Sequence, residues 1–123
     1  MLDYHKKCEL GDDENIIHVA ENILPDTGRG GSFSNALLIT NKHVVLVRLD
    51  LFYRNVKKTE LYPLDTILKV NGEPVMRTVE SKRSPVAIEL KYRDHVDVYA
   101  FSSKTDASAW TRALTEVLAV WAG

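Results

Sequence analysis

Residues 35–49, "NALLITNKHVVLVRL", decide the fold class of this chain. Two apolar runs rich in Val, Ile and Leu flank the polar residues 40–43, within which the chain has to reverse. Runs rich in β-branched residues favour strands, and so short a connection joins antiparallel neighbours. The stretch therefore predicts a tight antiparallel hairpin, with Asn41 as the turn residue able to adopt a left-handed backbone.

The second arm of this hairpin alternates along its length. Arg48 and Asp50 take one face, and the opposite face is aliphatic, with Val45, Val47, Leu49 and Leu51. An alternation of this kind is typical of a sheet that is buried on one side.

The segments around the hairpin predict more strands and the turns between them. Residues 15–24, "NIIHVAENIL", indicate a first strand, and the Gly-rich residues 25–34 indicate a long exposed loop. Residues 56–64, "VKKTELYPL", predict a strand that ends, or lies at an edge, at Pro63. Asn71-Gly72 is the strongest short turn signal in the chain.

Two later strands alternate in the same way and are joined through residues 93–95. In the first, the apolar face holds Val86, Ile88, Leu90 and Tyr92, and the polar face Glu89, Lys91 and Arg93. In the second, the apolar face holds Val96, Val98 and Ala100, and the other face Asp97 and Tyr99. Each is expected to pack on the core with its apolar face.

The last element changes period from two to the spacing of a helix. Ser103 or Thr105 is suited to cap its start, and Asp106 suits the positive end of the helix dipole. The apolar positions share one stripe: Trp110, Ala113, Leu114, Val117, Leu118 and Trp121. About seven short strands followed by one amphipathic C-terminal helix are predicted, with the stripe closing the open end of the β-structure.

Length and composition indicate one domain with one core. The chain has 123 residues, 45% of them hydrophobic, and a formal net charge of −1. This balance gives no overall attraction to nucleic acid. Residues 1–14 mix charges without a period and are expected to form a loose or short helical lead-in outside the core, with the domain spanning residues 15–123. A single cysteine, Cys8, and no apolar leader favour a reducing, cytoplasmic location.

This order of elements resembles the pleckstrin-homology (PH) superfold. The likeness covers residues 15–122, and is closest to the bacterial PH and GRAM-like branches through "LLITNKHVVLV" and "YPLDTILKV". Trp110 matches the Trp in the family's terminal helix, and the order is also similar to the PH-like module of chorein-type lipid-transfer proteins. The resemblance implies a bent, seven-stranded antiparallel sandwich or barrel capped by the C-terminal helix.

No set of residues indicates catalysis, a metal or a cofactor. His5 and Cys8 offer two zinc ligands where a structural site needs four. His18, His43 and His95 lack the neighbouring Ser or Cys that nucleophilic catalysis requires. The "GRGG" run, residues 28–31, lacks the Lys-Ser/Thr of a phosphate-binding loop. We therefore expect a non-enzymatic protein without cofactor or metal, in which Cys8 is neither catalytic nor a ligand.

Basic residues are the candidates for binding. By the resemblance, the connections after the first, third and sixth strands meet at the open end of the barrel, where lipid-binding relatives hold a headgroup. Mapped there, five cations are predicted to bind an acidic lipid headgroup, phosphoinositides included, or an acidic peptide: Arg29, Arg54, Lys57, Lys58 and Arg93. The family's Lys…Arg-x-Arg signature is absent, and lysines on an edge strand also discourage edge-to-edge pairing. A second group, Arg77, Lys82 and Arg83, is read as a charged loop ending at Pro85.

Two function classes remain open. One is a module at the periphery of membranes that recognises acidic headgroups through these loops. The other is a protein-interaction or self-assembly module, in which sheet edges and exposed Phe33, Phe52 and Tyr53 meet a partner or a second copy. The fold by itself does not choose between them.

Overall fold

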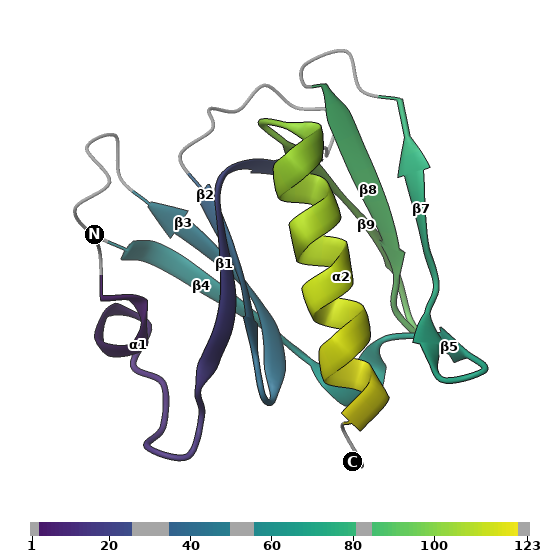
Figure 1. Cartoon of the computed structure of the whole chain (residues 1–123). Helices are drawn as coiled ribbons and strands as arrows, with labels where there is room; N and C mark the ends of the chain where they lie inside the picture. The colour runs from purple at the N-terminus through teal and green to yellow at the C-terminus, as the bar shows by residue number, and fades with distance from the viewer. Residues whose placement is uncertain (1–2, 26–34, 50–55, 81–84, 121–123) are drawn as a thin grey trace.

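The computed structural model describes residues 3–25, 35–49, 56–80 and 85–120 of the chain. They form a mainly antiparallel β-structure with one long helix laid across it (Figure 1). The helical elements are α1 (Tyr4–Lys7), the 3₁₀ turn η1 (Leu64–Thr66) and α2 (Lys104–Val120). The strands are β1 (Ile16–Pro25), β2 (Asn35–Thr40), β3 (His43–Leu49), β4 (Val56–Pro63), β5 (Lys69–Val70), β6 (Glu73–Pro74), β7 (Met76–Val79), β8 (Val86–Lys91) and β9 (Val96–Phe101).

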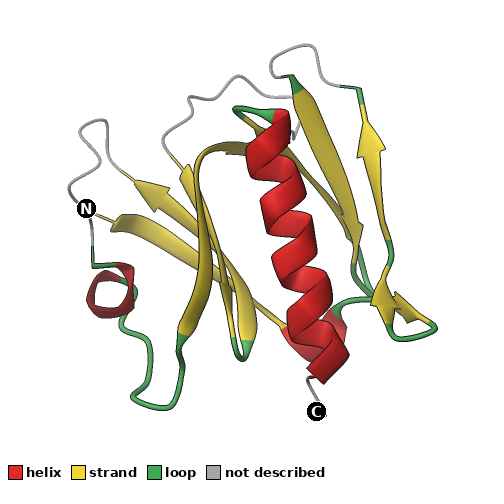
Figure 2. Ribbon diagram, in the orientation of Figure 1, coloured by secondary structure: helices red, strands yellow, loops and turns green. Residues whose placement is uncertain are grey.

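Seven of these strands form one bent sheet in the order β4-β3-β2-β1-β9-β8-β7 (Figure 2). β1 joins the two halves, because it pairs with β2 along most of its length and with β9 through Leu24 and Pro25. Register shifts interrupt its pairing with β2, and Asn22 beside one of them has a φ of 59°. Irregularities of this kind bend a strand, which lets a single β1 serve both halves. The predicted mainly-β fold with one C-terminal helix is confirmed.

The hairpin of β2 and β3 forms as predicted, but its turn works differently. The Thr40 hydroxyl accepts hydrogen bonds from the backbone N–H groups of Lys42 (3.0 Å) and His43 (2.8 Å). Asn41 does not adopt the left-handed backbone. Its amide side chain instead accepts from the N–H of Asn15 (2.7 Å) and donates to the carbonyl of Asp13 (3.0 Å). Asn41 therefore ties the N-terminal segment to the turn rather than shaping the turn itself.

The Asn71-Gly72 turn is confirmed. Both residues have positive φ, 55° and 82°, as a two-residue turn that matches the twist of its strands requires. It joins β5 to β6 in a small separate ribbon.

The main core lies between the two halves of the sheet and α2. The expected apolar face of β8 is confirmed, since Val86, Ile88 and Leu90 belong to this core. The expected face of β9 does not face this core, although its Ala100 is buried with Ala87 in a small separate cluster against which Val98 packs. Tyr99 and Phe101 point into the core, where their rings lie 6.0 and 5.8 Å from that of Trp110. Two aromatic rings offer far more apolar area to bury than the valines and alanine of the opposite face.

The hairpin is buried on both faces, not on one. Val44 and Leu46 of β3 face the main core. The opposite face forms a second apolar cluster together with Tyr4, and its strand members are Ala36, Leu38, Val45, Val47 and Leu49. The expectation that residues 1–14 lie outside the core is therefore wrong for Tyr4, which is 3% exposed. Its hydroxyl donates to the Glu21 carboxylate at 2.6 Å, so the ring is buried while its polar tip is satisfied.

Helix α2 carries the predicted apolar stripe into the main core. Trp110, Leu114, Val117 and Leu118 are buried and Ala113 packs beside them, whereas Trp121 lies outside the described residues. Ser103, not Thr105, caps the helix, since its hydroxyl accepts from the N–H of Asp106 at 3.1 Å. The helix packs chiefly on β1, β6, β8 and β9.

Replacing Trp110 with Ala is expected to lower the free energy of unfolding by about 3–5 kcal/mol, because the ring is 0% exposed and contacts two aromatic rings. Trp110→Phe is the control and should lose less than half as much. Phe keeps most of the volume and removes an indole N–H that finds no acceptor among the described residues. Denaturant melts measure both, and a loss below about 1 kcal/mol for Trp110→Ala would contradict this packing.

Replacing Tyr4 with Ala is expected to cost about 2–4 kcal/mol and to expose the second apolar cluster, because Tyr4 is the buried residue of α1. Binding of a hydrophobic dye in native buffer should rise in the variant. Lys7→Ala, an exposed position in the same helix, is the control and should stay within about 0.5 kcal/mol of the parent chain. Equal stability of the two variants would show that the segment is dispensable.

Candidate functional site

The predicted anion-binding residues lie in different parts of the molecule. Arg29 and Arg54 fall outside the described residues, as do Phe33, Phe52 and Tyr53. Lys57 is placed on β4 by its backbone, and its side chain is not described. Lys58 is an exposed residue near the start of β4, and Arg93 is an exposed residue of the turn between β8 and β9.

Lys58 and Arg93 are not brought together. The backbone N–H of Arg93 donates to the carbonyl of Thr66 at 2.8 Å, which places the β8–β9 turn beyond the C-terminal end of β4. Lys58 lies toward the other end of that strand, and the five steps along the strand from Lys58 to Pro63 span about 16 Å at roughly 3.3 Å each. A single anion is therefore not contacted by both.

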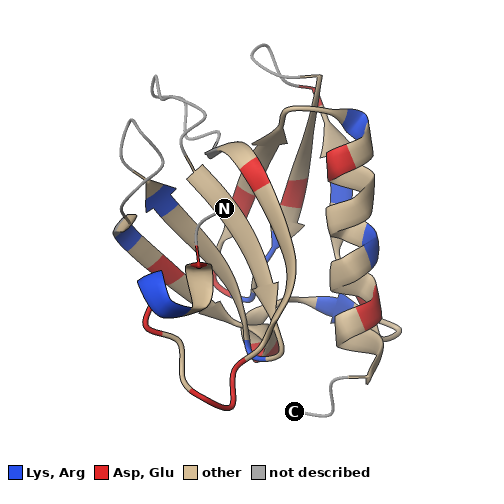
Figure 3. Cartoon of the chain, turned by 60° about the vertical axis from the view of Figure 1, so that its left-hand side comes forward, with Lys and Arg blue, Asp and Glu red and all other residues tan. Residues whose placement is uncertain are grey.

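Arg48 is a cation that the sequence analysis did not select. It lies directly opposite Lys58 in the pairing of β3 with β4, and Figure 3 shows basic segments at these adjoining strand ends. The Glu60 carboxylate lies 3.7 Å from Arg48 and 3.6 Å from Lys58. Like charges directly across a strand pair repel, and one carboxylate shared by two cations leaves a net positive charge. Only the strand register shows this pair.

Of the second basic group, Arg77 belongs to a strand and not to the charged loop expected from the sequence. Arg77 lies in β7 and forms a two-pronged ion pair with Glu89 of β8, at 2.9 and 3.2 Å. Hydrogen bonding to Arg77 lowers the pKa of Glu89, and the same bond raises the pKa of Arg77. Lys82 and Arg83 lie outside the described residues.

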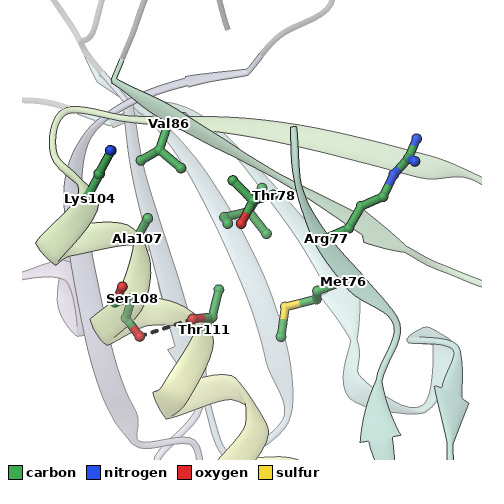
Figure 4. Close-up of a pocket in the computed structure, with 9 residues that line it drawn as sticks. Met76, Arg77, Thr78, Val86, Lys104, Ala107, Ser108 and Thr111 are labelled. Atoms are coloured by element: carbon green, nitrogen blue, oxygen red, sulfur yellow. Dashed lines mark hydrogen bonds between the residues drawn. The ribbon is translucent and has the colours of Figure 1, made fainter. Parts of the chain in front are cut away.

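A groove of about 540 Å³ runs between β7 and α2. Figure 4 shows Met76 and Thr78 on the strand side and Lys104, Ala107, Ser108 and Thr111 on the helix side. Arg77 also lines the groove, and buried Val86 and Ile88 complete the lining, so the floor is apolar and the rim is polar. Since β7 is an end strand of the sheet, the groove follows a sheet edge.

His43 and His95 each join a structural network. The Nδ1 atom of His43 lies 2.8 Å from the Glu14 carboxylate, which holds the N-terminal segment on the hairpin turn. His95 stacks on Tyr92 with ring centroids 4.5 Å apart and contacts the carboxylates of Asp94 (2.7 Å) and Asp97 (3.2 Å). Burial lowers the pKa of His95, but the two carboxylates outweigh it, so the pKa stands above its ordinary value.

Cys8 packs against the second apolar cluster. Burial raises the pKa of its thiol, and a hydrogen bond with Thr59 opposes this. A raised pKa disfavours the thiolate that reacts or binds metal. Within the described ranges, no group of three or more His, Cys, Asp or Glu side chains is placed to hold a metal ion. Nor is any helix in those ranges long and apolar enough to cross a membrane.

Comparisons with known proteins identify the fold. No protein-family model matches the sequence, and no curated protein matches it. Among solved structures, the Vps36 N-terminal PH domain aligns with a TM-score of 0.63 at 12% identity, over 89% of this chain and 82% of that one. The hSac2 domain from human phosphoinositide phosphatase Sac2 aligns with a TM-score of 0.55 at 17% identity, over 91% of this chain and 73% of that one.

These likenesses confirm the PH-like fold predicted from the sequence. At such low identities they show the fold alone. The bacterial or GRAM-like branch stays a prediction.

Proposed function

We propose that this chain is a non-enzymatic PH-like binding module whose main ligand is a segment of another protein, held in the groove between β7 and α2. The observation that carries the proposal is the groove itself, which combines an end strand, an apolar floor and a polar rim. Sites for peptide segments recur at such sheet edges, because the edge offers main-chain hydrogen bonds and the neighbouring surface offers side-chain pockets.

The lining of the groove supports a binding role rather than a catalytic one. Of its residues, Thr78, Ser108 and Thr111 carry hydroxyls, and no His, Cys or carboxylate lies among them to activate a hydroxyl or move a proton. The Thr111 hydroxyl is committed to the Ser108 carbonyl at 3.0 Å (Figure 4). Polar groups of this kind orient a ligand.

A second candidate is recognition of an acidic lipid headgroup near the connection between β3 and β4. The opposed Arg48 and Lys58, which share one carboxylate, favour it. Arg29, Arg54 and Lys57 remain contributors predicted from the sequence, whereas Arg93 lies near the other end of β4 and would bind separately. Exposed charges of this sort bind weakly and are screened by salt, so membrane contact would depend on several copies acting together.

Blocking the groove is expected to abolish peptide binding. A displayed library of random dodecapeptides, selected on the parent chain, should yield a shared sequence pattern. Ser108→Trp places an indole over the exposed rim of the groove and should weaken the selected peptides by at least about tenfold in fluorescence anisotropy. Ala119→Trp, an exposed position of α2 outside the groove, is the control and should bind like the parent chain. Failure to select any shared pattern, or undiminished binding by Ser108→Trp, would overturn the proposal.

The lipid candidate is tested by reversing Arg54, Lys57 and Lys58 to Glu and measuring sedimentation with anionic liposomes. If these residues bind headgroups, binding at low salt should fall at least about tenfold, since each charge near an acidic surface contributes about 1 kcal/mol. The control reverses Lys6, Lys7 and Lys91, exposed lysines elsewhere, and changes the net charge equally. Parent protein that does not bind at low salt, or equal losses in the two triple variants, would remove this candidate.

A further inference from the structure

We infer that two copies of this chain dimerise by exchanging residues 3–8, each copy docking this segment on the outer face of β1, β2, β3 and β4 of the other. The partner is thus a second copy, and the docking surface is the one that α1 occupies within a single chain. Such a dimer carries every other binding surface twice, which strengthens binding to ligands with several sites. The inference does not depend on the proposed groove between β7 and α2.

The first step is the position of α1 on the sheet. One row of residues crosses the four strands in register: Glu21, Ala36, Val47 and Thr59. At one end of this row the Tyr4 hydroxyl donates to the Glu21 carboxylate. At the other end Cys8 forms a hydrogen bond with Thr59. The segment therefore extends from β1 to β4, and because so short a helix is not stable alone, its conformation depends on this face.

The second step is the apolar area that the segment leaves uncovered. The next row on the same face is aliphatic across all four strands: Val19, Leu38, Val45 and Leu61. Its two central residues are fully buried, whereas Val19 and Leu61 at its ends are 37% and 47% exposed. Two copies that face each other across exchanged segments bring these flanking side chains into the interface, and their removal from water favours the dimer.

The third step is the reversal that folds α1 back onto its own chain. Glu9 follows the helix with a φ of 55°. Its N–H donates to the Lys6 carbonyl at 3.2 Å, and the N–H of Leu10 donates to the His5 carbonyl at 3.0 Å. Glycine is the usual residue at this left-handed position after a helix, because a side chain there is strained. Glu9 therefore disfavours the closed arrangement, and an extended connection releases the strain.

The fourth step is the connection itself, residues 9–12. The backbone hydrogen bonds described for these residues join them only to residues 5–14. Attachment to the sheet resumes at Asp13, whose carbonyl accepts from the Asn41 amide and whose carboxylate pairs with Lys42. Four extended residues span about 13 Å at roughly 3.3 Å each. The segment can thus pass to a facing copy while Asp13 keeps its place on the hairpin turn.

The experiment is a disulfide that can form only between two chains. The parent chain has its cysteine at position 8, and a Cys8→Ser/Thr59→Cys chain has its cysteine at position 59. The two chains carry different tags and are mixed at high concentration, equilibrated and mildly oxidised. Exchange places Cys8 of one copy beside position 59 of the other, so a non-reducing gel should show the heterodimer. Cys8→Ser/Lys91→Cys, with its cysteine at an exposed position outside this face, is the control and should give at least about tenfold less.

A second measurement tests the reversal. Glu9→Gly in both chains should lower the heterodimer yield about threefold or more, because glycine stabilises the closed arrangement. Light scattering of the parent chain should show a dimer fraction that rises with concentration, and Glu9→Gly should lower this fraction.

Three results would each overturn the inference. The first is a heterodimer yield no higher than that of the Lys91→Cys control. The second is a parent chain that stays monomeric at the concentration used for oxidation. The third is a yield that Glu9→Gly leaves unchanged, since dimerisation then does not proceed by exchange of this segment. All three leave the proposed peptide groove standing, because that groove is tested by Ser108→Trp.

Discussion

The packing of Trp110 fixes the arrangement of this molecule. The ring sits in the main core against Tyr99 and Phe101 of β9, and it holds α2 across β1, β6, β8 and β9. Burial of a whole aromatic ring removes a large apolar area from water, so the helix has one strongly preferred position on the sheet. In that position the helix stands apart from β7, and a groove remains between them. The same contact thus closes the core and creates the candidate site.

Burial on both faces distinguishes the β2–β3 hairpin from an ordinary antiparallel pair with one face in solvent. The inner face of the β2–β3 hairpin packs into the main core, and its outer face is covered by Tyr4 and the N-terminal segment. Polar contacts hold this cover at its far end, where Glu14 accepts from Thr40 at 2.6 Å and lies 2.8 Å from His43. The "lead-in" is therefore part of the folded unit. The dense aliphatic composition of the hairpin is explained by two buried faces.

Strand pairing decides which charges are free to bind. Arg77 looks like a loop cation in the sequence, yet it lies in β7 and is neutralised by Glu89. In the sequence, Arg48 alternates with valines and is expected to face solvent, yet the strand register places it directly opposite Lys58. Lys104 becomes a candidate for ligand binding because it lines the groove, whereas the sequence around it does not indicate a binding site. Whether a cation of this protein is free to bind a ligand can be judged only when its neighbours across the sheet are known.

The sequence alone determined the elements that depend on near neighbours in the chain. The hairpin of residues 35–49, the Asn71-Gly72 turn and the stripe around Trp110 follow from periodicity and turn chemistry, and these gave the PH-like fold. Tertiary structure decided which face of β9 joins the main core, where Tyr4 packs and which cations lie close together. These outcomes depend on pairing between segments far apart in the chain, and a strand pattern does not encode its partner's register. The groove has the same origin, because its walls come from β7, β8 and α2, which become neighbours only when the core has packed.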